Sequence, residues 1–252
     1  MTSWLVVTLM APFASFGERA GNVERSTADR PTRSALIGLA GAALGIRRDE
    51  REGQRRLAES FRVATATFSA GTLVSDFHTY QSLPSASKPA PRTRAQALLR
   101  KEDLNTSITR REYRADVWHE AAYACEPDAH WTLEELAAAF RSPRFVLFLG
   151  RKSCPPGAPL DPRIMEVDDL IDLFAKRRCE SAWLDSNGPL FSRSLRSVGR
   201  VTVAAERQAD LGAMTGPARR HRRYDEPGDR ESWQFVARRE FVTTLSFEKE
   251  AI

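Results

Sequence analysis

Two arginines stand at the start of a segment that is predicted to be a helix. Arg30 and Arg33 come just before residues 35–46, an unbroken run of small and apolar residues, and Thr32 or Ser34 can cap the free N–H groups of the first turn. Cations are unfavourable at this positive end of a helix dipole unless an anion lies between them, and a phosphate group suits that position. The local pattern leaves two interpretations open: a phosphate site, or a buried helix with two solvated arginines.

A second cluster combines glycine, cations and a hydroxyl group. Gly150 is followed by Arg151, Lys152 and Ser153, which places backbone N–H groups, positive charge and a side-chain donor at one turn. The spacing differs from the Gly-x-x-x-x-Gly-Lys-Ser/Thr loop of nucleotide triphosphatases. These residues therefore indicate contacts with a phosphodiester rather than with a nucleoside triphosphate.

Aromatic residues beside cations add the chemistry of base stacking. Arg110 and Arg111 precede Tyr113 within one short predicted strand, which combines phosphate binding with stacking. Phe16, near the end of the first predicted strand, is a further aromatic candidate, although core packing is the commoner role of such a residue.

Residue types suited to RNA cleavage are present but dispersed. A metal-independent ribonuclease needs a base near the 2′-hydroxyl and a cation for the developing charge, and His78, His119, Tyr113 and Lys152 are the available groups. Because no pattern places two of them together, we expect no catalytic residue. The cysteines are far apart and no Cys-x-x-Cys occurs, which argues against a structural zinc site. We expect no metal and no cofactor.

The composition is typical of a soluble globular protein and favours a polyanionic partner. The chain has 252 residues, of which 42% are hydrophobic and 28% charged, and its formal net charge is +5. Nearly all of its 38 basic residues are arginine, which binds phosphates and stacks on bases, although a GC-rich genome produces the same bias. No segment approaches the ~20 apolar residues that span a bilayer. Residues 1–13 carry no positively charged leader, and reduced thiols fit a cytoplasmic location.

The first elements predict an α+β fold. Residues 4–10 are predicted to form a buried strand, 35–46 and 49–59 helices, and 61–68 with 73–80 a β-hairpin whose turn is Ser-Ala-Gly-Thr. This order opens a ferredoxin-like βαββαβ unit, a scaffold that RNA-recognition modules also use. One face of the first helix carries three glycines, which predicts close approach of a neighbouring element: Gly38, Gly41 and Gly45.

The later elements complete this unit and lead into a smaller domain. Residues 131–141 are predicted to be a helix with Thr132 as its cap, and 144–149 a short strand. A first domain is expected over residues 1–150 and a smaller, β-rich domain over 151–252. The second contains a predicted helix (167–178) and strands (201–205, 233–247). Residues 219–223 are a charge run, predicted to be a solvated loop, with a nucleic-acid or partner contact as the alternative.

Several segments resemble the CasD-type subunits of the type I-E CRISPR complex Cascade, which belong to the repeat-associated (RAMP) superfamily of RNA-binding proteins. The two strongest matches are residues 30–49, Arg-Pro-Thr-Arg-Ser through Ile-Arg-Arg-Asp, and 149–155, Leu-Gly-Arg-Lys-Ser-Cys-Pro. Residues 76–79 and 105–113 are also similar, and 233–242 more loosely.

The resemblance implies a β-hairpin thumb, inserted at about residues 81–112 of a ferredoxin-like (RRM-like) domain, that folds over guide RNA. It implies a subunit that caps the 5′ handle of CRISPR RNA (crRNA). Its partners would be the backbone filament, the large PAM-reading subunit and other Cascade subunits, with target DNA nearby and no membrane. The expected RNA contacts are Phe16, Arg30, Arg33, Ser34, Arg110, Arg111, Tyr113, Arg151, Lys152 and Ser153.

Two other functions compete with this one. Relatives in another CRISPR subtype use the same scaffold as a metal-independent endoribonuclease that cuts the repeat. The type I-E signatures favour the binding subunit, because a separate subunit does the cutting in that subtype. A general RNA-recognition protein would need regular base-stacking aromatic motifs, which the sequence lacks.

Overall fold

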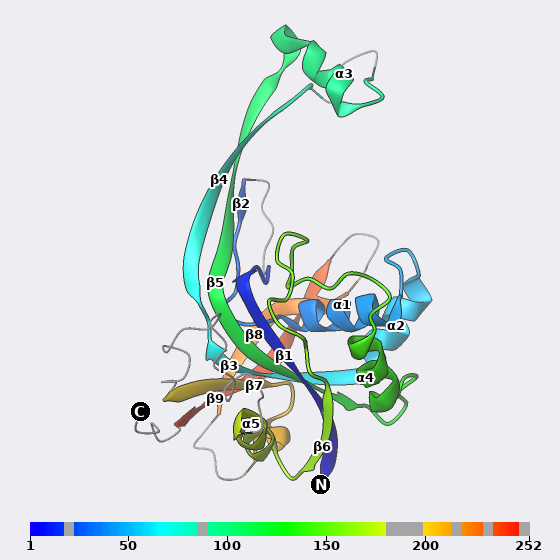
Figure 1. Cartoon of the computed structure of the whole chain (residues 1–252), viewed down its shortest axis with the longest axis vertical. Helices are drawn as coiled ribbons and strands as arrows, with labels where there is room; N and C mark the ends of the chain where they lie inside the picture. Colours follow the sequence, from blue (N-terminus) through cyan, green and yellow to red (C-terminus); the bar gives the residue numbers. More distant parts are fainter. Residues whose placement is uncertain (18–22, 85–89, 180–198, 213–217, 229–233, 247–252) are drawn as a thin grey trace.

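The structure, a computed structural model, describes residues 1–17, 23–84, 90–179, 199–212, 218–228 and 234–246. The longer elements are β1 (Thr2–Ala14), β2 (Glu24–Arg25), α1 (Arg33–Leu44), α2 (Arg51–Ser60), β3 (Phe61–Ser69), β4 (Thr72–Ser82), α3 (Arg94–Leu99), β5 (Asn105–Cys125), α4 (Leu133–Arg141), β6 (Arg163–Val167), α5 (Leu170–Cys179), β7 (Arg200–Ala205), β8 (Arg219–Pro227) and β9 (Phe235–Ser246). Short 3-10 turns cover Lys101–Asp103 and Gln208–Leu211. Within the described ranges the strands form one sheet in the order β6-β1-β5-β3-β7-β9-β8, with β2 and β4 also paired to β5 (Figure 1).

Helices cover both faces of this mixed α+β sheet. Leu5 and Val7 of β1 pack in a core that includes apolar residues of α1, α2 and α4, whereas Trp4 and Val6 point into a second core with α5. A strand that is buried on both faces has a continuous apolar sequence, because neither set of alternating residues reaches water. This confirms the buried first strand that the sequence predicts.

The sheet contains the predicted order of strand, helix, strand, strand, helix, strand. The elements are β1, α1 with α2, β3, β5, α4 and β6, and their four strands are neighbours in the sheet. The fourth strand is β6, however, and the predicted strand at residues 144–149 is wrong. These residues form a loop in which Arg144 N and Phe145 N donate to Ala43 O and Ala42 O at the end of α1. Their backbone groups thus satisfy free helix carbonyls.

The predicted hairpin between residues 61–68 and 73–80 is also wrong. β3 and β4 lie end to end along the same partner, because Ser69 pairs with Trp118 and Thr72 with Ala115 of β5. The expected turn is instead an irregularity between two collinear strands, where Gly71 has φ +69°. A Cβ atom on Gly71 would lie 2.3 Å from Ala115 O. Glycine in a strand therefore marked a bulge here rather than a reversal.

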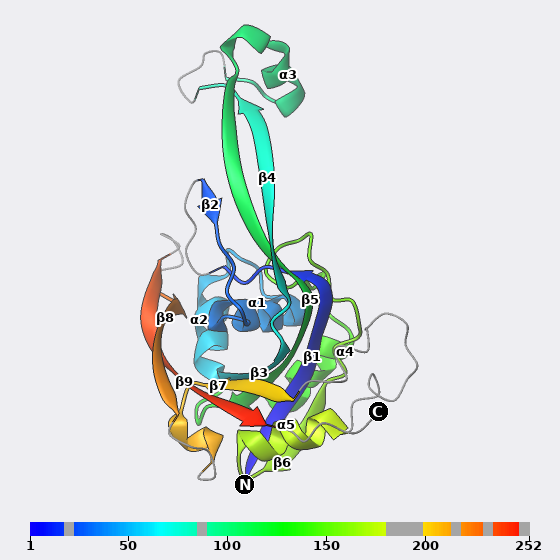
Figure 2. The ribbon, with the colours of Figure 1, turned by 90° about the vertical axis from the view of Figure 1, so that its left-hand side faces the viewer.

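The chain reverses instead between β4 and β5, which project from the sheet as a long two-stranded ribbon with α3 at its tip (Figures 1 and 2). We call this ribbon, residues 72–115, the thumb. The insertion expected at residues 81–112 covers its tip and most of the returning strand, and the ribbon itself begins earlier, at Thr72.

Helix α1 begins and ends near the predicted residues, but its glycines play three different roles. Thr32 caps the helix by accepting from Ala35 N at 3.2 Å. A Cβ on Gly41 would lie 3.1 Å from Leu57 Cδ2 of α2, so close approach explains this glycine alone. Gly38 has open space beside it, and Gly45 ends the helix with φ +81°. The expectation of one closely packed glycine face is therefore wrong.

The predicted boundary between residues 150 and 151 does not divide the sheet. β6 pairs with β1, and β7 pairs with β3, so strands from both sides of the boundary join the same sheet. The division into two domains stays a prediction. Residues 219–223, expected to form a loop, lie in the edge strand β8. The last predicted strand is β9, and both ends of the predicted range, Trp233 and Phe247, lie outside the described residues. In the described part of the chain no helix is long and apolar enough to cross a membrane.

Candidate nucleic-acid interface

The two arginines at the start of α1 are buried and bound to the protein's own carboxylates. Arg30 is 9% exposed, and its Nη2 lies 2.6 Å from Glu240 Oε2, while its Nη1 lies 3.0 Å from Asp29 Oδ1. Arg33 is 8% exposed and pairs with Glu226 and Glu206. It also donates to the carbonyl oxygens of Phe61 and Ala58. These guanidinium groups are occupied by the protein's own acceptors, which argues against a phosphate site here; a contact of Arg30 or Arg33 with RNA stays a prediction.

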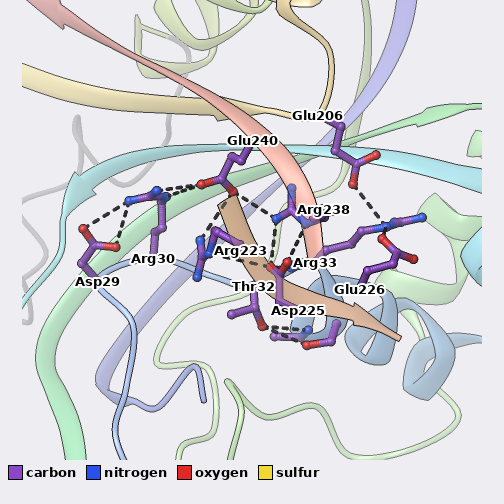
Figure 3. A network of polar contacts seen from close by, with 12 residues as sticks. Asp29, Arg30, Thr32, Arg33, Glu206, Arg223, Asp225, Glu226, Arg238 and Glu240 are labelled. Atoms are coloured by element: carbon purple, nitrogen blue, oxygen red, sulfur yellow. Dashed lines mark hydrogen bonds and ion pairs between the residues drawn. The ribbon is translucent and has the colours of Figure 1, made fainter. Parts of the chain in front are cut away.

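An anion does lie at the helix start, but it belongs to the chain itself. Arg33 N donates to Asp225 Oδ2 at 2.8 Å. Asp225 also accepts from Arg238, and Glu240 accepts from Arg238 and Arg30 (Figure 3). Burial alone would raise the pKa of Asp225, but the hydrogen bond and charge of Arg238 outweigh it and the pKa lies below its ordinary value. We call this group the α1 network: Asp29, Arg30, Arg33, Glu206, Arg223, Asp225, Glu226, Arg238 and Glu240.

Two further candidates near this end of the molecule are also turned inward. Ser34 is half-buried, and its Oγ lies 3.1 Å from Thr32 Oγ1. Phe16 is 2% exposed, and its ring packs edge-on to His119 with centroids 5.6 Å apart, so no face of it is open to a base. Phe13, 45% exposed and edge-on to Tyr113, is the accessible aromatic of β1. The sequence around the end of β1 gave no signal that Phe13 is accessible and Phe16 buried.

The glycine-led loop is fixed against the end of β1. Gly150 has φ +88°, and a Cβ there would lie 1.8 Å from Ser15 O, so this position accepts only glycine. Ser15 N donates to Leu149 O, and Cys154 N donates to Arg151 O, which closes the loop. Cys154 is buried below it, and burial raises the pKa of its thiol. Lys152 and Ser153 are exposed.

This loop brings two of the predicted residues together. The guanidinium carbon of Arg151 lies 4.6 Å from the centroid of the Tyr113 ring of β5, and Arg151 Nη2 donates to Arg25 O. Arg25 and Glu24 form β2, which pairs in parallel with Arg111 and Arg110. The loop, β1, β2 and β5 thus meet at the foot of the thumb. We call the residues there the thumb base: Arg110, Arg111, Tyr113, Arg114, Arg151, Lys152 and Ser153.

The thumb base carries positive charge without carboxylate partners. Among the described residues, none forms an ion pair with Arg110, Arg111, Arg114 or Arg151. Arg111 Nε, Arg114 Nε and Arg151 Nη1 are inaccessible to water and lack any hydrogen-bond partner. Leaving a charged donor unpaired is costly. Because Arg111, Arg114 and Arg151 are only half-buried, a shift of these side chains toward an external acceptor would relieve that cost. Tyr113 and Arg111 lie on one face of β5, and Arg110 and Arg114 on the other, because strand residues alternate. Arg114 was not predicted as an RNA contact. The signal that could have found it is its place in the same arginine-rich segment, one residue after Tyr113.

Among the described candidates for RNA cleavage, Tyr113 and Lys152 both belong to the thumb base, whereas the two histidines lie elsewhere. His119 is 0% exposed, and burial, then the charges of Arg30 and Arg114, lower its pKa to about 3. His78 lies on the thumb, with its Nε2 2.6 Å from Asp76 Oδ2. It pairs with Thr109, four residues from Tyr113 and so about 13 Å away along the strand. In the described ranges no group of three or more His, Cys, Asp or Glu is placed to hold a metal ion.

Comparisons with known proteins agree on one group of relatives. A family model described as "CRISPR-associated protein (Cas_Cas5)" matches residues 4–239. The Cascade subunit CasD of Escherichia coli K12 is 32% identical over 168 residues, which are 64% of this chain and 70% of that protein.

Two solved structures share the fold. A chain of a CRISPR RNA-guided surveillance complex matches with a TM-score of 0.58 at 20% identity, covering 96% of this chain and 89% of its own length. A structure described as a Cas protein matches with a TM-score of 0.52 at 25% identity, covering 98% and 95%. The arrangement of sheet and helices is therefore one that Cas proteins adopt.

Proposed function

Because the chain belongs to the Cas5 family of CRISPR-associated proteins, we propose that it is a non-catalytic subunit of a type I-E Cascade complex that binds the 5′ handle of crRNA at its thumb base. The observation that carries the proposal is the contrast in pairing: thumb-base arginines lack carboxylate partners, whereas Arg30 and Arg33 have them. The handle contacts proposed are Arg110, Arg111, Tyr113, Arg114, Arg151, Lys152 and Ser153.

The chemistry of the thumb base suits single-stranded RNA. Proteins that read such RNA combine phosphate contacts with side chains that stack on unpaired bases. The Arg151 guanidinium lies over the Tyr113 ring at a cation–π distance, and this contact orients both side chains before RNA arrives. Lys152 and Ser153 add an exposed cation and an exposed hydroxyl on the same fixed loop. One surface of the protein can thus contact the RNA phosphate backbone, independently of base sequence, and stack one base.

The thumb supports the proposal that the chain works inside an assembly. A two-stranded ribbon has no core of its own and is marginally stable alone. Phe77 is 58% exposed, Ile108 47% and Leu99 80%, so the ribbon presents apolar side chains to water. RNA or a neighbouring subunit would cover them. The backbone filament and the large PAM-reading subunit are the partners proposed, with target DNA held nearby by the complex.

The alternative function, a metal-independent endoribonuclease that cuts the CRISPR repeat, finds less support. It requires a base and a cation at one scissile bond. His119 is enclosed, and His78 lies about 13 Å from the Tyr113 position along the thumb. Repeat cleavage would need RNA to bring His78 or Lys152 to the reacting phosphate.

The distinguishing experiment mixes the purified full chain, in EDTA, with labelled repeat RNA and separately with a handle-sequence oligonucleotide. We expect the handle to bind and the repeat to stay intact. A single defined cut in the repeat, lost in His78→Ala or Lys152→Ala, would overturn the non-catalytic assignment. Absence of handle binding by a folded chain would overturn the handle assignment.

A further inference from the structure

The β8–β9 hairpin carries two pairs of directly opposed arginines, one on each face. Arg223 of β8 pairs with Arg238 of β9, and Arg222 pairs with Arg239 in the next register position. Like charges directly opposite each other in a sheet are destabilising unless a counter-charge lies between them. The two faces of this hairpin meet that requirement in different ways.

The inner pair is neutralised by the protein. Arg238 lies 2.6 Å from Asp225 Oδ1 and 3.0 Å from Glu240 Oε1, and Arg223 lies 3.5 Å from the same Glu240 oxygen. All four side chains belong to the α1 network (Figure 3). Asp225 and Glu240 therefore supply the counter-charges of the inner arginine pair.

The outer pair has no such partner among the described residues. Arg222 and Arg239 are exposed, and so is Arg220, which lies two residues from Arg222 and hence on the same face. These three arginines, with His221, Ala237 and Arg238, line a hollow of ≈ 530 Å³. Arg222 lies over the ring of Tyr224, with 5.2 Å between its guanidinium carbon and the ring centroid, and Tyr224 is 41% exposed.

We propose that this outer face, Arg220, Arg222, Tyr224 and Arg239, binds the phosphodiester backbone of a nucleic acid at a second site separate from the thumb base. The guanidinium fork matches phosphate oxygens, and an exposed tyrosine next to it offers a stacking surface. A protein partner is a poorer fit, because the centre of a protein interface is apolar. This face has no apolar centre, since its four residues are three arginines and one tyrosine. The contact is independent of base sequence, because it consists of backbone-directed cations.

The site is distinct from the handle contact in position as well as in residues. β8 is the edge strand, four strand spacings from β5, or about 19 Å across the sheet (Figure 2). The inference does not rest on the handle function. The nucleic acid bound at this outer face is either the guide RNA beyond the thumb base or the DNA that the guide selects, and both present the same phosphodiester chemistry.

The test measures binding of the full chain to two labelled probes of random sequence, a 20-base-pair DNA duplex and a 20-nucleotide RNA strand, over a range of salt. Loss of two phosphate contacts in Arg222→Ala/Arg239→Ala lowers the slope of log K against log salt by about 1.8 for duplex DNA or about 1.4 for single-stranded RNA. The matched control is Arg55→Ala, since Arg55 is exposed but already paired with Glu52 and Glu59.

A second variant separates binding from folding. Arg222→Glu places a carboxylate opposite Arg239, so we expect an unchanged or raised melting temperature together with weaker binding. A reduced slope on either probe supports the proposal and identifies which nucleic acid the face holds. Unchanged slopes on both probes, or an equal reduction in Arg55→Ala, would overturn it. Failure here leaves handle binding unaffected, because that is measured with the handle oligonucleotide and thumb-base variants.

Discussion

The start of α1 and the thumb base are both rich in arginine, yet they have opposite electrostatic environments. At the start of α1 the fold brings carboxylates from β8, β9 and the segment after β7 to within 3.3 Å of Arg30 and Arg33. At the thumb base Arg151 contacts a backbone carbonyl and an aromatic ring, and among the described residues no carboxylate forms an ion pair with Arg111, Arg114 or Arg151. Arginines of the first kind stabilise the fold, and those of the second kind are available to a ligand.

The largest effect expected from this comparison is on stability, in Arg33→Ala. The change leaves Glu226, Glu206 and the Phe61 and Ala58 carbonyls without their shared partner. Removing one side of a buried ion pair costs about 3 kcal/mol or more. Urea unfolding should show this loss, whereas Arg55→Ala, which breaks only exposed pairs, should change the unfolding free energy far less. Equal stability of Arg33→Ala and the wild type would contradict a structural role for Arg33.

A smaller effect should appear in the pH dependence of stability, through Glu206. Burial raises the pKa of Glu206 to about 7, with Arg33 and Arg238 opposing the rise. Because this folded-state pKa lies above the ordinary 4.5, protonation of Glu206 stabilises the folded state at low pH. That contribution is complete below about pH 4.5 and is lost as the pH rises through about 7.

Glu206→Gln, which mimics the protonated group, should therefore remove about 2 kcal/mol of the stability change across that window. Urea unfolding at about pH 5 and about pH 7.5 measures it. Asp225 and Glu240 have lowered pKa values, so their contribution is lost only at more acidic pH and does not interfere. The same pH dependence in the variant and the wild type would show that Glu206 does not titrate in this range.

Local sequence patterns predicted much of the fold but little about which arginines are free. The buried first strand, the capped helices α1 and α4 and the existence of an insertion all follow from periodicity, capping residues and composition within one segment. The bulge at Gly71 was mistaken for a turn, because glycine occurs in turns and in bulges alike. The loop at residues 144–149 was mistaken for a strand, because short apolar runs occur in loops as well as in strands.

The internal pairing of Arg30 and Arg33 could not be predicted for a different physical reason. The helix dipole argument correctly required an anion at the start of α1. Sequence alone does not reveal that Asp225 and Glu240, about 200 residues later, supply it. Tyr113 and Arg151 were both predicted, but their contact depends on Gly150 seating the loop against β1, which is a tertiary effect.

The most direct test of the comparison is the salt dependence of handle-RNA binding in Arg111→Ala/Arg151→Ala, measured beside Arg33→Ala under conditions in which both are folded. Two lost phosphate contacts should lower the slope of log K against log salt by about 1.4, whereas Arg33→Ala should keep the wild-type slope. An unchanged slope in the thumb-base variant, or a reduced slope in folded Arg33→Ala, would contradict the division between structural and ligand-binding arginines.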